Sequence, residues 1–250
     1  MGERGGEQTA RRMRAYWDER ARLNAAYYVD TSLSYEQPDM DAFWRDGEVI
    51  VDKALHGGPV TVTPAGTAVE LGCGLGRNLR ALAKHYDHVA GFDISEQMLA
   101  RARQELDPAI ELHHSDGTSL RPLADGVAGL VLSYTVLQHI PDVKVQQGYL
   151  REMARVLAPG GYAVLQWNGT AGSTAAWAVR RWWLTVRARL GRPSEPYGRE
   201  VPEFLGARIP RSRMVASLRG LGLEVCGTTG DGTIDSWVWA RRPAAAAGAR

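Results

Sequence analysis

The chain has 250 residues, of which 44% are hydrophobic and 23% charged, an ordinary composition for a globular protein. A chain of this length can fold on its own apolar core, and the composition excludes collagen-like, disordered and disulfide-scaffold proteins. The net charge of +2 conceals an uneven distribution, because residues 170–250 carry 13 Arg, no Lys and six acidic side chains. This basic share reflects either an anionic binding partner or a GC-rich coding sequence.

Three features bear on the compartment of the protein. Cys73 and Cys226 lie far apart and match no disulfide framework or zinc-binding spacing. Residues 1–10 are polar and lack the apolar core of a secretory signal, and apolar stretches such as 129–137 fall short of the ~20 residues that span a membrane. We therefore expect a cytoplasmic protein with no membrane partner.

The N-terminal segment contains two helical patterns, around residues 11–28 and 40–55. Because these patterns precede the first predicted strand, we expect residues 1–55 to form a helical flap that is part of the same domain. The aromatic residues of the flap recur at helical offsets: Tyr16, Trp17, Tyr27, Tyr28, Phe43 and Trp44.

From residue 67 onward, short apolar runs alternate with helical stretches, which is typical of βαβ units around a parallel sheet. We expect an α/β fold: a doubly wound, seven-stranded, mostly parallel sheet that ends in an antiparallel hairpin turning at 230–232. The predicted strands cover residues 68–71, 88–93, 110–113, 129–134, 161–167, 223–228 and 236–241. The predicted helices cover residues 77–85, 95–106, 145–157, about 173–190 and 211–221.

The strongest local motif is a glycine loop between the first predicted strand and the next helix. Gly72, Gly74 and Gly76 follow an apolar strand in a G-x-G-x-G spacing, and a helix begins at Arg77. Glycines allow close approach of the backbone to a ligand, and a helix N-terminus presents free N–H groups. The spacing differs from the G-x-G-x-x-G of nicotinamide-binding proteins. We infer a ligand site at this loop.

Three further features accompany the loop at predicted strand ends. Asp93 ends the second strand 21 residues after Gly72, where a carboxylate can accept hydrogen bonds from both hydroxyls of a ribose. Asp116 and Gly117 follow the third strand, and 157–161 introduces the fifth. Open α/β sheets bind ligands at this edge, so the features indicate one nucleoside-binding site.

The glycine loop and these three features follow one another in a fixed order between residues 67 and 242. In that order the chain resembles the class I S-adenosylmethionine-dependent methyltransferases, and in particular the bacterial enzymes that act on small molecules. The resemblance implies S-adenosylmethionine as cofactor and S-adenosylhomocysteine as product. It also implies a role for each matching residue. Gly72, Cys73 and Gly74 would line the methionine part, Glu70 would organise the loop, Asp93 would hold the ribose, Ile94 and Met98 would flank the adenine, and Asp116 with Gly117 would meet its amino group.

The resemblance is less specific for the flap. Leading helices in similar enzymes close over the cofactor, so Tyr16, Tyr28 or Trp44 would contact the methionine carboxylate, as would Arg77. The alternative for the aromatic residues is plain packing between helices, because apolar stripes at helical spacing usually belong to a core.

The chemistry requires little from the protein beyond positioning. Methyl transfer from a sulfonium is an in-line displacement, which gains from holding donor and acceptor together. Tyr134 would border cofactor and acceptor. His139, in the sequence 137–140, either accepts a proton from a hydroxyl acceptor or shapes its loop through a backbone hydrogen bond. His113 and His114 point to opposite faces of a strand, so we expect no metal site there.

The segment 168–210 is longer than a normal connection and predicts a cap that selects the acceptor. Its apolar positions fall on one helical face, which we expect to pack on the body of the protein. The domain would then cover residues 56–242, with a disordered tail at 243–250. The residues of this face are Val179, Trp182, Trp183, Val186 and Leu190.

The sequence therefore predicts a methyltransferase that acts at O, N or C of a small-molecule acceptor, as a monomer or homodimer. The first alternative is a protein of the same fold that binds S-adenosylmethionine without methylating. An RNA methyltransferase and a nicotinamide oxidoreductase are further alternatives. No RNA-binding motif accompanies the basic residues, so no nucleic-acid partner is expected.

Overall fold

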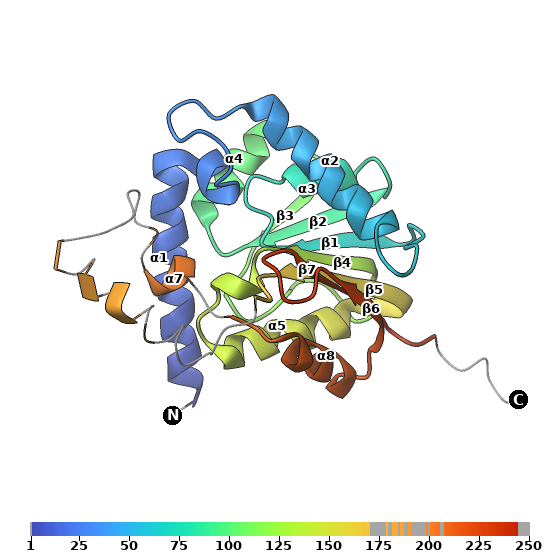
Figure 1. Ribbon diagram of the computed structural model, residues 1–250. Coiled ribbons are helices and arrows are strands. Elements are labelled where there is room, and N and C mark those ends of the chain that lie inside the picture. The colour runs from blue at the N-terminus through green and yellow to red at the C-terminus, as the bar shows by residue number, and fades with distance from the viewer. Residues whose placement is uncertain are drawn as a thin grey trace, which may run out of the picture.

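A computed structural model describes residues 2–170, 179, 182–184, 186–187, 190–191, 199, 201–205 and 208–244. Its centre is one seven-stranded sheet in the order β3-β2-β1-β4-β5-β7-β6 (Figure 1). The strands are β1 (Thr67–Leu71), β2 (His88–Asp93), β3 (Glu111–His114), β4 (Ala128–Tyr134), β5 (Leu157–Trp167), β6 (Glu224–Thr229) and β7 (Ser236–Arg241). Strands β1 to β5 pair in parallel, and β7 is antiparallel to both β5 and β6. The predicted doubly wound sheet with its antiparallel hairpin is confirmed.

Strand β5 starts earlier than the sequence predicts. Leu157 already pairs with Ala128, and the register then shifts before Leu130 pairs with Tyr162. The extra residues form an irregularity that holds Gly160 at a φ of +83°, a conformation open to glycine. The turn signal in this stretch therefore marks a bulge inside the strand rather than its beginning.

Helices cover both faces of the sheet, as Figure 1 shows. One face carries α2 (Met40–His56), α3 (Arg77–Leu82) and α4 (Glu96–Glu105), and the other carries α5 (Val143–Val156) and α8 (Arg211–Gly220). Alternate strand residues supply the two cores: Val131 of β4 belongs to the core beneath α5, whereas Leu130 and Leu132 belong to the core beneath α2. Each helix therefore buries one apolar stripe against the sheet.

Helix α1 (Gly2–Val29) runs past the edge of the site and is longer than predicted. It bends at Asn24, which has an extended backbone (φ −162°, ψ 89°). The side chain of Asn24 accepts from the N–H of Tyr27 at 3.1 Å and donates to the carbonyl of Tyr35, so it caps the final turn. Asp18 of α1 accepts hydrogen bonds from Ser95 and Gln97 at the start of α4. These contacts fix the flap helix to the sheet domain.

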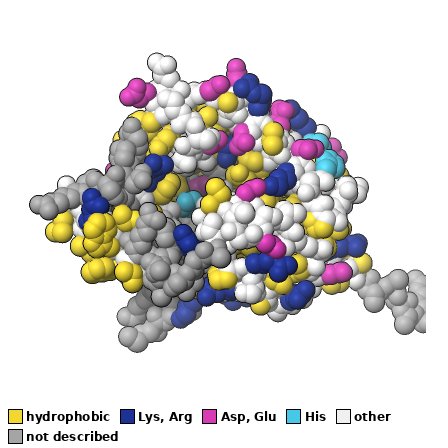
Figure 2. Space-filling view, in the orientation of Figure 1, with side chains coloured by type: hydrophobic (Ala, Val, Ile, Leu, Met, Phe, Trp, Pro, Cys, Tyr) yellow, Lys and Arg dark blue, Asp and Glu magenta, His cyan; other side chains and the backbone are white. Residues whose placement is uncertain are grey.

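The face of the 168–210 segment that was expected to pack inward is exposed. Val179 is 66% exposed, Trp182 65%, Trp183 50% and Leu190 71%. The prediction of packing on the body is therefore wrong for these four residues, because helical spacing shows which side chains share a face but not what covers that face. Figure 2 shows hydrophobic side chains gathered at the left edge of the molecule. Val186, the fifth residue of this face, is half-buried. The masked positions between residues 171 and 207, and the tail from residue 245, lie outside the described residues.

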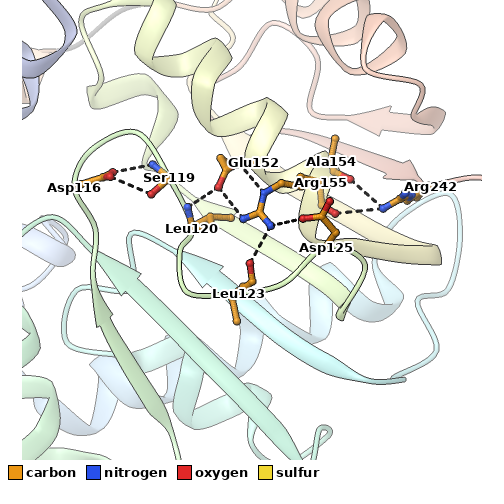
Figure 3. A network of polar contacts seen from close by, with 9 residues as sticks. All are labelled: Asp116, Ser119, Leu120, Leu123, Asp125, Glu152, Ala154, Arg155 and Arg242. Atoms are coloured by element: carbon orange, nitrogen blue, oxygen red, sulfur yellow. Dashed lines mark hydrogen bonds and ion pairs between the residues drawn. The ribbon is translucent and has the colours of Figure 1, made fainter. Parts of the chain in front are cut away.

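Arg155 on α5 ties the loop before β4 to the helix (Figure 3). Its guanidinium donates to both carboxylate oxygens of Glu152, at 2.8 and 2.9 Å, to Asp125 at 2.7 Å and to the carbonyl of Leu123 at 2.9 Å. Glu152 in turn accepts from the N–H of Leu120. The network joins the loop before β4 to helix α5 through charged hydrogen bonds, which are stronger than neutral ones.

We expect Arg155→Met to lower the free energy of unfolding by about 1–2 kcal/mol, because the partly buried Glu152 carboxylate loses its cation. Urea denaturation measures this. Arg151→Met removes an exposed Arg from the same helix and should change stability by less than about 0.5 kcal/mol. Equal effects of the two substitutions would contradict the network's role.

Candidate functional site

A cavity of about 580 Å³ opens at the carboxyl ends of β1, β2, β4 and β5. Its volume lies within the ~300–1,000 Å³ of small-molecule sites. Its walls come from the glycine loop, the strand ends, α1 with the loop that follows it, and α7 (Pro202–Leu205). Among the described residues, no group of three or more His, Cys, Asp and Glu side chains could hold a metal ion.

The glycine loop forms one wall of the cavity. The N–H groups of Gly72 and Cys73 both donate to the carbonyl of Phe92 on β2, at 2.6 and 3.0 Å. Gly72 has a φ of +74°, and a Cβ there would lie 2.2 Å from a methyl of Val136. A side chain at this position would collide with the wall opposite, so glycine is required. Burial raises the pKa of the Cys73 thiol, which keeps it neutral beside the loop.

Asp93 ends β2 and faces the cavity beside the loop. One carboxylate oxygen accepts from the N–H of Gly74 and the other from that of Ser95, both at 2.8 Å. Each oxygen keeps a lone pair for a ligand. Burial raises the pKa of Asp93, and the two hydrogen bonds partly offset that effect. The arrangement presents a fixed, acceptor-only group that suits a pair of hydroxyls.

Glu70 and Asn78 form a buried polar pair at the base of the cavity. The Asn78 amide donates to Oε1 of Glu70 at 2.7 Å, while Glu70 Oε2 and Asn78 Oδ1 have no hydrogen-bond partner. Burial raises the pKa of Glu70 to about 8, and the bond from Asn78 offsets part of this shift. Two buried acceptors without donors indicate a place for a ligand N–H group or water.

The raised pKa of Glu70 predicts how the free energy of unfolding depends on pH. In the unfolded chain this carboxyl ionises near 4.5, whereas in the folded chain it keeps its proton up to about 8. The contribution of Glu70 to the free energy of unfolding is therefore complete below pH 4.5 and falls as the pH rises to 8, by up to roughly 5 kcal/mol. Glu70→Gln should remove this loss, so that its stability relative to wild type grows with pH in urea denaturation. A constant difference would refute the buried protonated carboxyl; the exposed Glu105→Gln is the control.

Arg77, at the start of α3, is almost fully buried at the other side of the loop. Its guanidinium forms ion pairs with Asp30 at 2.8 Å and with Asp46 at 2.5 Å. It also lies 5.6 Å from the ring centre of Tyr134, which lines the cavity. Arg77 thus fastens the loop after α1 to α2 and α3.

The flap residues proposed from the sequence divide into two groups. Tyr28 lines the cavity and accepts a hydrogen bond from Arg20 at 3.4 Å. Tyr16 and Trp44 do not line it: Arg20 lies over the ring of Tyr16 and Arg80 over that of Trp44, each at 4.9 Å. For Tyr16 and Trp44 the structure shows helix packing instead of a place at the cavity.

Asp116 also lies away from the cavity, although the neighbouring Gly117 lines it. The Asp116 carboxylate accepts from the backbone and hydroxyl of Thr118 and of Ser119, at 2.7 to 3.0 Å. Figure 3 shows the bonds to Ser119. Burial raises its pKa, but these bonds outweigh burial and hold the pKa below its usual range. The side chain therefore closes a turn, and its contact with the adenine stays a prediction. Ile94 and Met98 line that end.

His139, in the short helix η1 (Leu137–His139), also lines the cavity. Its Nδ1 donates to the carbonyl of Phe204, because a carbonyl can only accept. Burial lowers the pKa of His139 to about 4, and this bond offsets part of the shift. The imidazole is therefore neutral near pH 7, with the lone pair on Nε2. Its ring centre lies 5.5 Å from that of Trp17 and 5.3 Å from that of Phe204.

Several residues that line the cavity were not predicted from the sequence. Asn168 directly follows β5, as Asp93 ends β2, so the strand-end rule could have found it. Gln138 adjoins His139 in sequence. Phe204 and Asp235 reach the cavity only through long-range contacts, and no local pattern marks either residue. Trp17 belongs to the aromatic pattern of the flap, but the pattern gave it no place at the site. His113 and His114 bond Glu111 and the carbonyl of Ile94, respectively, outside the cavity.

Comparisons with known proteins agree with this geometry. Residues 69–165 match a family model described as a methyltransferase domain. The chain is 35% identical over 118 residues to a 2-methyl-6-phytyl-1,4-hydroquinone methyltransferase of Synechocystis, covering 46% of this chain and 36% of that protein. It is 30% identical over 161 residues to a trans-aconitate 2-methyltransferase of Azoarcus, covering 64% and 54%. The chain thus spans between about a third and a half of these curated relatives.

Solved structures share the fold at low sequence identity. A SAM-dependent methyltransferase from Methanosarcina mazei superposes with a TM-score of 0.56 at 19% identity, over 72% of this chain and 93% of that one. An O-methyltransferase family protein from Burkholderia thailandensis gives a TM-score of 0.58 at 18% identity, over 82% and 58%. Both likenesses concern the sheet and its helices.

Proposed function

We propose, from the premise that this chain carries a class I S-adenosylmethionine-dependent methyltransferase domain over residues 69–165, that it methylates a small-molecule acceptor. The acceptor atom is O, N or C, and the product of the cofactor is S-adenosylhomocysteine. The observation that supports this most is the meeting of the glycine loop, Asp93 and Glu70 at one cavity that also reaches His139.

The residues present fit the cofactor. Asp93 would hold the ribose, because its carboxylate is fixed by Gly74 and Ser95 and still accepts. The bare backbone of Gly72 to Gly74 would lie along the methionine part. The unpartnered Oδ1 of Asn78 suits its ammonium group, directly or through water, and the Glu70 carboxyl would accept from the same group once it ionises beside that cation. When bound, the cofactor supplies an electrophilic methyl group on a sulfonium.

The chain's own residues would hold the cofactor and the acceptor together and accept a proton from the acceptor. Arg77, paired with Asp30 and Asp46, would keep the loop after α1 across the methionine end, next to Tyr28. Positioning of this kind replaces a bimolecular encounter by an intramolecular one, worth effective molarities of ~10⁵ M or more. Tyr134 would border the reacting atoms. His139, neutral and with Nε2 available, would accept a proton from an acidic acceptor.

The proposal also covers the substrate class, the compartment and the oligomeric state. Relatives whose names give a substrate act on small molecules, so we propose a small-molecule acceptor and no nucleic acid. In the described part of the chain, no helix is long and apolar enough to cross a bilayer. We place the enzyme in the cytoplasm, as a monomer or a homodimer.

The test follows the formation of S-adenosylhomocysteine from S-adenosylmethionine with panels of phenols, carboxylic acids, amines and enols. Isotopic label from the methyl group should appear in one acceptor, whose mass rises by one CH₂. Cofactor binding with an acceptor that changes structure but not mass would favour non-methylating chemistry in the same site.

A further inference from the structure

The end of the cavity around His139 has a defined set of free hydrogen-bonding groups. Several polar side chains there are already committed. Gln166 accepts from the N–H of Thr135 at 3.0 Å and donates to the carbonyl of Ile234 at 2.8 Å. Asp235 binds Lys53 through one carboxylate oxygen and the indole N–H of Trp237 through the other, both at 2.6 Å. The Gln166 amide and the Asp235 charge are thus each already engaged by groups of the protein.

Two amides at this end keep their donors. The oxygen of Gln138 accepts from the backbone N–H of Asn168, and the oxygen of Asn168 accepts from the backbone and hydroxyl of Thr170. Within the described residues, the NH₂ groups of Gln138 and Asn168 have no partner, although both side chains line the cavity. The free groups here are thus N–H donors on neighbouring residues, linked to each other through one hydrogen bond.

The third free group is the lone pair on Nε2 of His139, since Nδ1 is held by the carbonyl of Phe204. The walls beside it are aromatic: Trp17 lies edge-on to His139 with an interplanar angle of 77°, and Phe204 lies 6.4 Å from Trp17. Flat rings pack favourably against such walls. Besides the Tyr134 hydroxyl, the described lining of this end offers two amide donors, one acceptor and no uncommitted charge.

Resting on the proposed function, we infer that the acceptor is a neutral hydroxyl compound with a flat body and a second oxygen, held by the amides of Gln138 and Asn168. The donors recognise the second oxygen, and Nε2 of His139 faces the hydroxyl. The reaction is then an O-methylation: the hydroxyl oxygen gains the methyl carbon as the carbon–sulfur bond breaks, and its proton passes to Nε2 and on to solvent. Gln138 and Asn168 are positioning residues in this assignment.

Charged acceptors fit this end poorly. A protonated amine would need a carboxylate, but Asp235 is paired with Lys53. A carboxylate would need a cation, and Arg77, the one Arg among the described residues that line the cavity, is paired with Asp30 and Asp46. Moving an unpaired charge out of water into such a site is costly.

The probe set is four phenols that share a hydroxyl and differ at the meta position: meta-hydroxyacetophenone, meta-ethylphenol, meta-hydroxybenzylamine and meta-hydroxybenzoate. Their dissociation constants are measured by NMR titration against the protein loaded with S-adenosylhomocysteine. We expect the ketone to bind at least about fivefold more tightly than the ethyl analogue, as one neutral hydrogen bond provides. Both charged analogues should bind more weakly than the ketone.

Asn168→Asp and Gln138→Glu test the donors, because each variant keeps the oxygen that accepts a backbone N–H and replaces only the NH₂ group. We expect each to abolish the preference for the ketone over the ethyl analogue and to favour the amine. Gln147→Ala is the matched control, since the Gln147 amide donates to Ser217 elsewhere on α5. A merely structural role of the two amides would weaken all probes alike.

The outcomes separate the inference from its premise. Preference of wild type for a charged probe, unchanged selectivity in both variants, or no binding of any probe to the loaded protein would overturn the inference. If S-adenosylhomocysteine itself does not bind, the proposed function fails, and that failure is seen before any probe is added.

Discussion

Asp93→Ala is expected to raise the dissociation constant of S-adenosylhomocysteine by about a hundredfold or more. The carboxylate would make two charged hydrogen bonds to ribose hydroxyls, each worth about 1.5–3 kcal/mol. The substitution also leaves the N–H groups of Gly74 and Ser95 without their acceptor, which loosens the glycine loop. Isothermal titration calorimetry measures the change, and circular dichroism verifies that the variant is folded.

Asp87→Ala is the matched control for this result. Asp87 is exposed and precedes β2 at the opposite end of the same strand. Its loss should leave the dissociation constant within about twofold of wild type. Equal affinity of a folded Asp93→Ala variant and of wild type would refute the assignment of the ribose.

His139→Ala is expected to reduce turnover about a hundredfold while S-adenosylhomocysteine binds as before, if the imidazole accepts the acceptor's proton. The pH dependence distinguishes this role further. Burial lowers the pKa of His139 to about 4, so its neutral, proton-accepting form persists down to that pH and activity should show no loss attributable to it near pH 6.5. The rate is measured under saturating cofactor from pH 5 to 8.

His139→Asn separates chemistry from loop structure. The Asn amide can replace Nδ1 as donor to the carbonyl of Phe204, but it offers nothing at the position of Nε2. Turnover that stays low in this variant assigns the proton acceptor to Nε2, whereas recovery to the wild-type rate makes His139 structural. The exposed His85→Ala should be fully active.

The sheet could be predicted because its signals are local. Buried parallel strands read as short apolar runs, and β2 and β7 begin and end at the predicted residues. The signal of the glycine loop is equally local. Gly72 and Gly74 adopt positive φ values, which glycine takes more easily than any other residue. The predicted start of a strand was wrong where an irregularity interrupts its apolar run, as before Tyr162 in β5.

Side-chain destinations were harder to predict. Asp116 stands at a strand end like Asp93, yet Thr118 and Ser119 follow it and capture its carboxylate in a turn. Tyr16 and Tyr28 share one helix, and only Tyr28 lies beyond the bend at Asn24 and reaches the cavity. Trp17 and Phe204 meet across a separation in sequence that no periodic pattern reports. Contacts of this kind depend on how the elements pack, not on the elements themselves.

Every role proposed for this chain requires that the cavity beside the glycine loop binds S-adenosylmethionine. Calorimetric titration of the full chain with S-adenosylhomocysteine tests it most directly. We predict saturable binding at one site in the micromolar range, lost in Asp93→Ala and retained in Asp87→Ala. If the folded wild-type protein does not bind S-adenosylhomocysteine, or binds NADH tightly instead, the cavity is not an S-adenosylmethionine site.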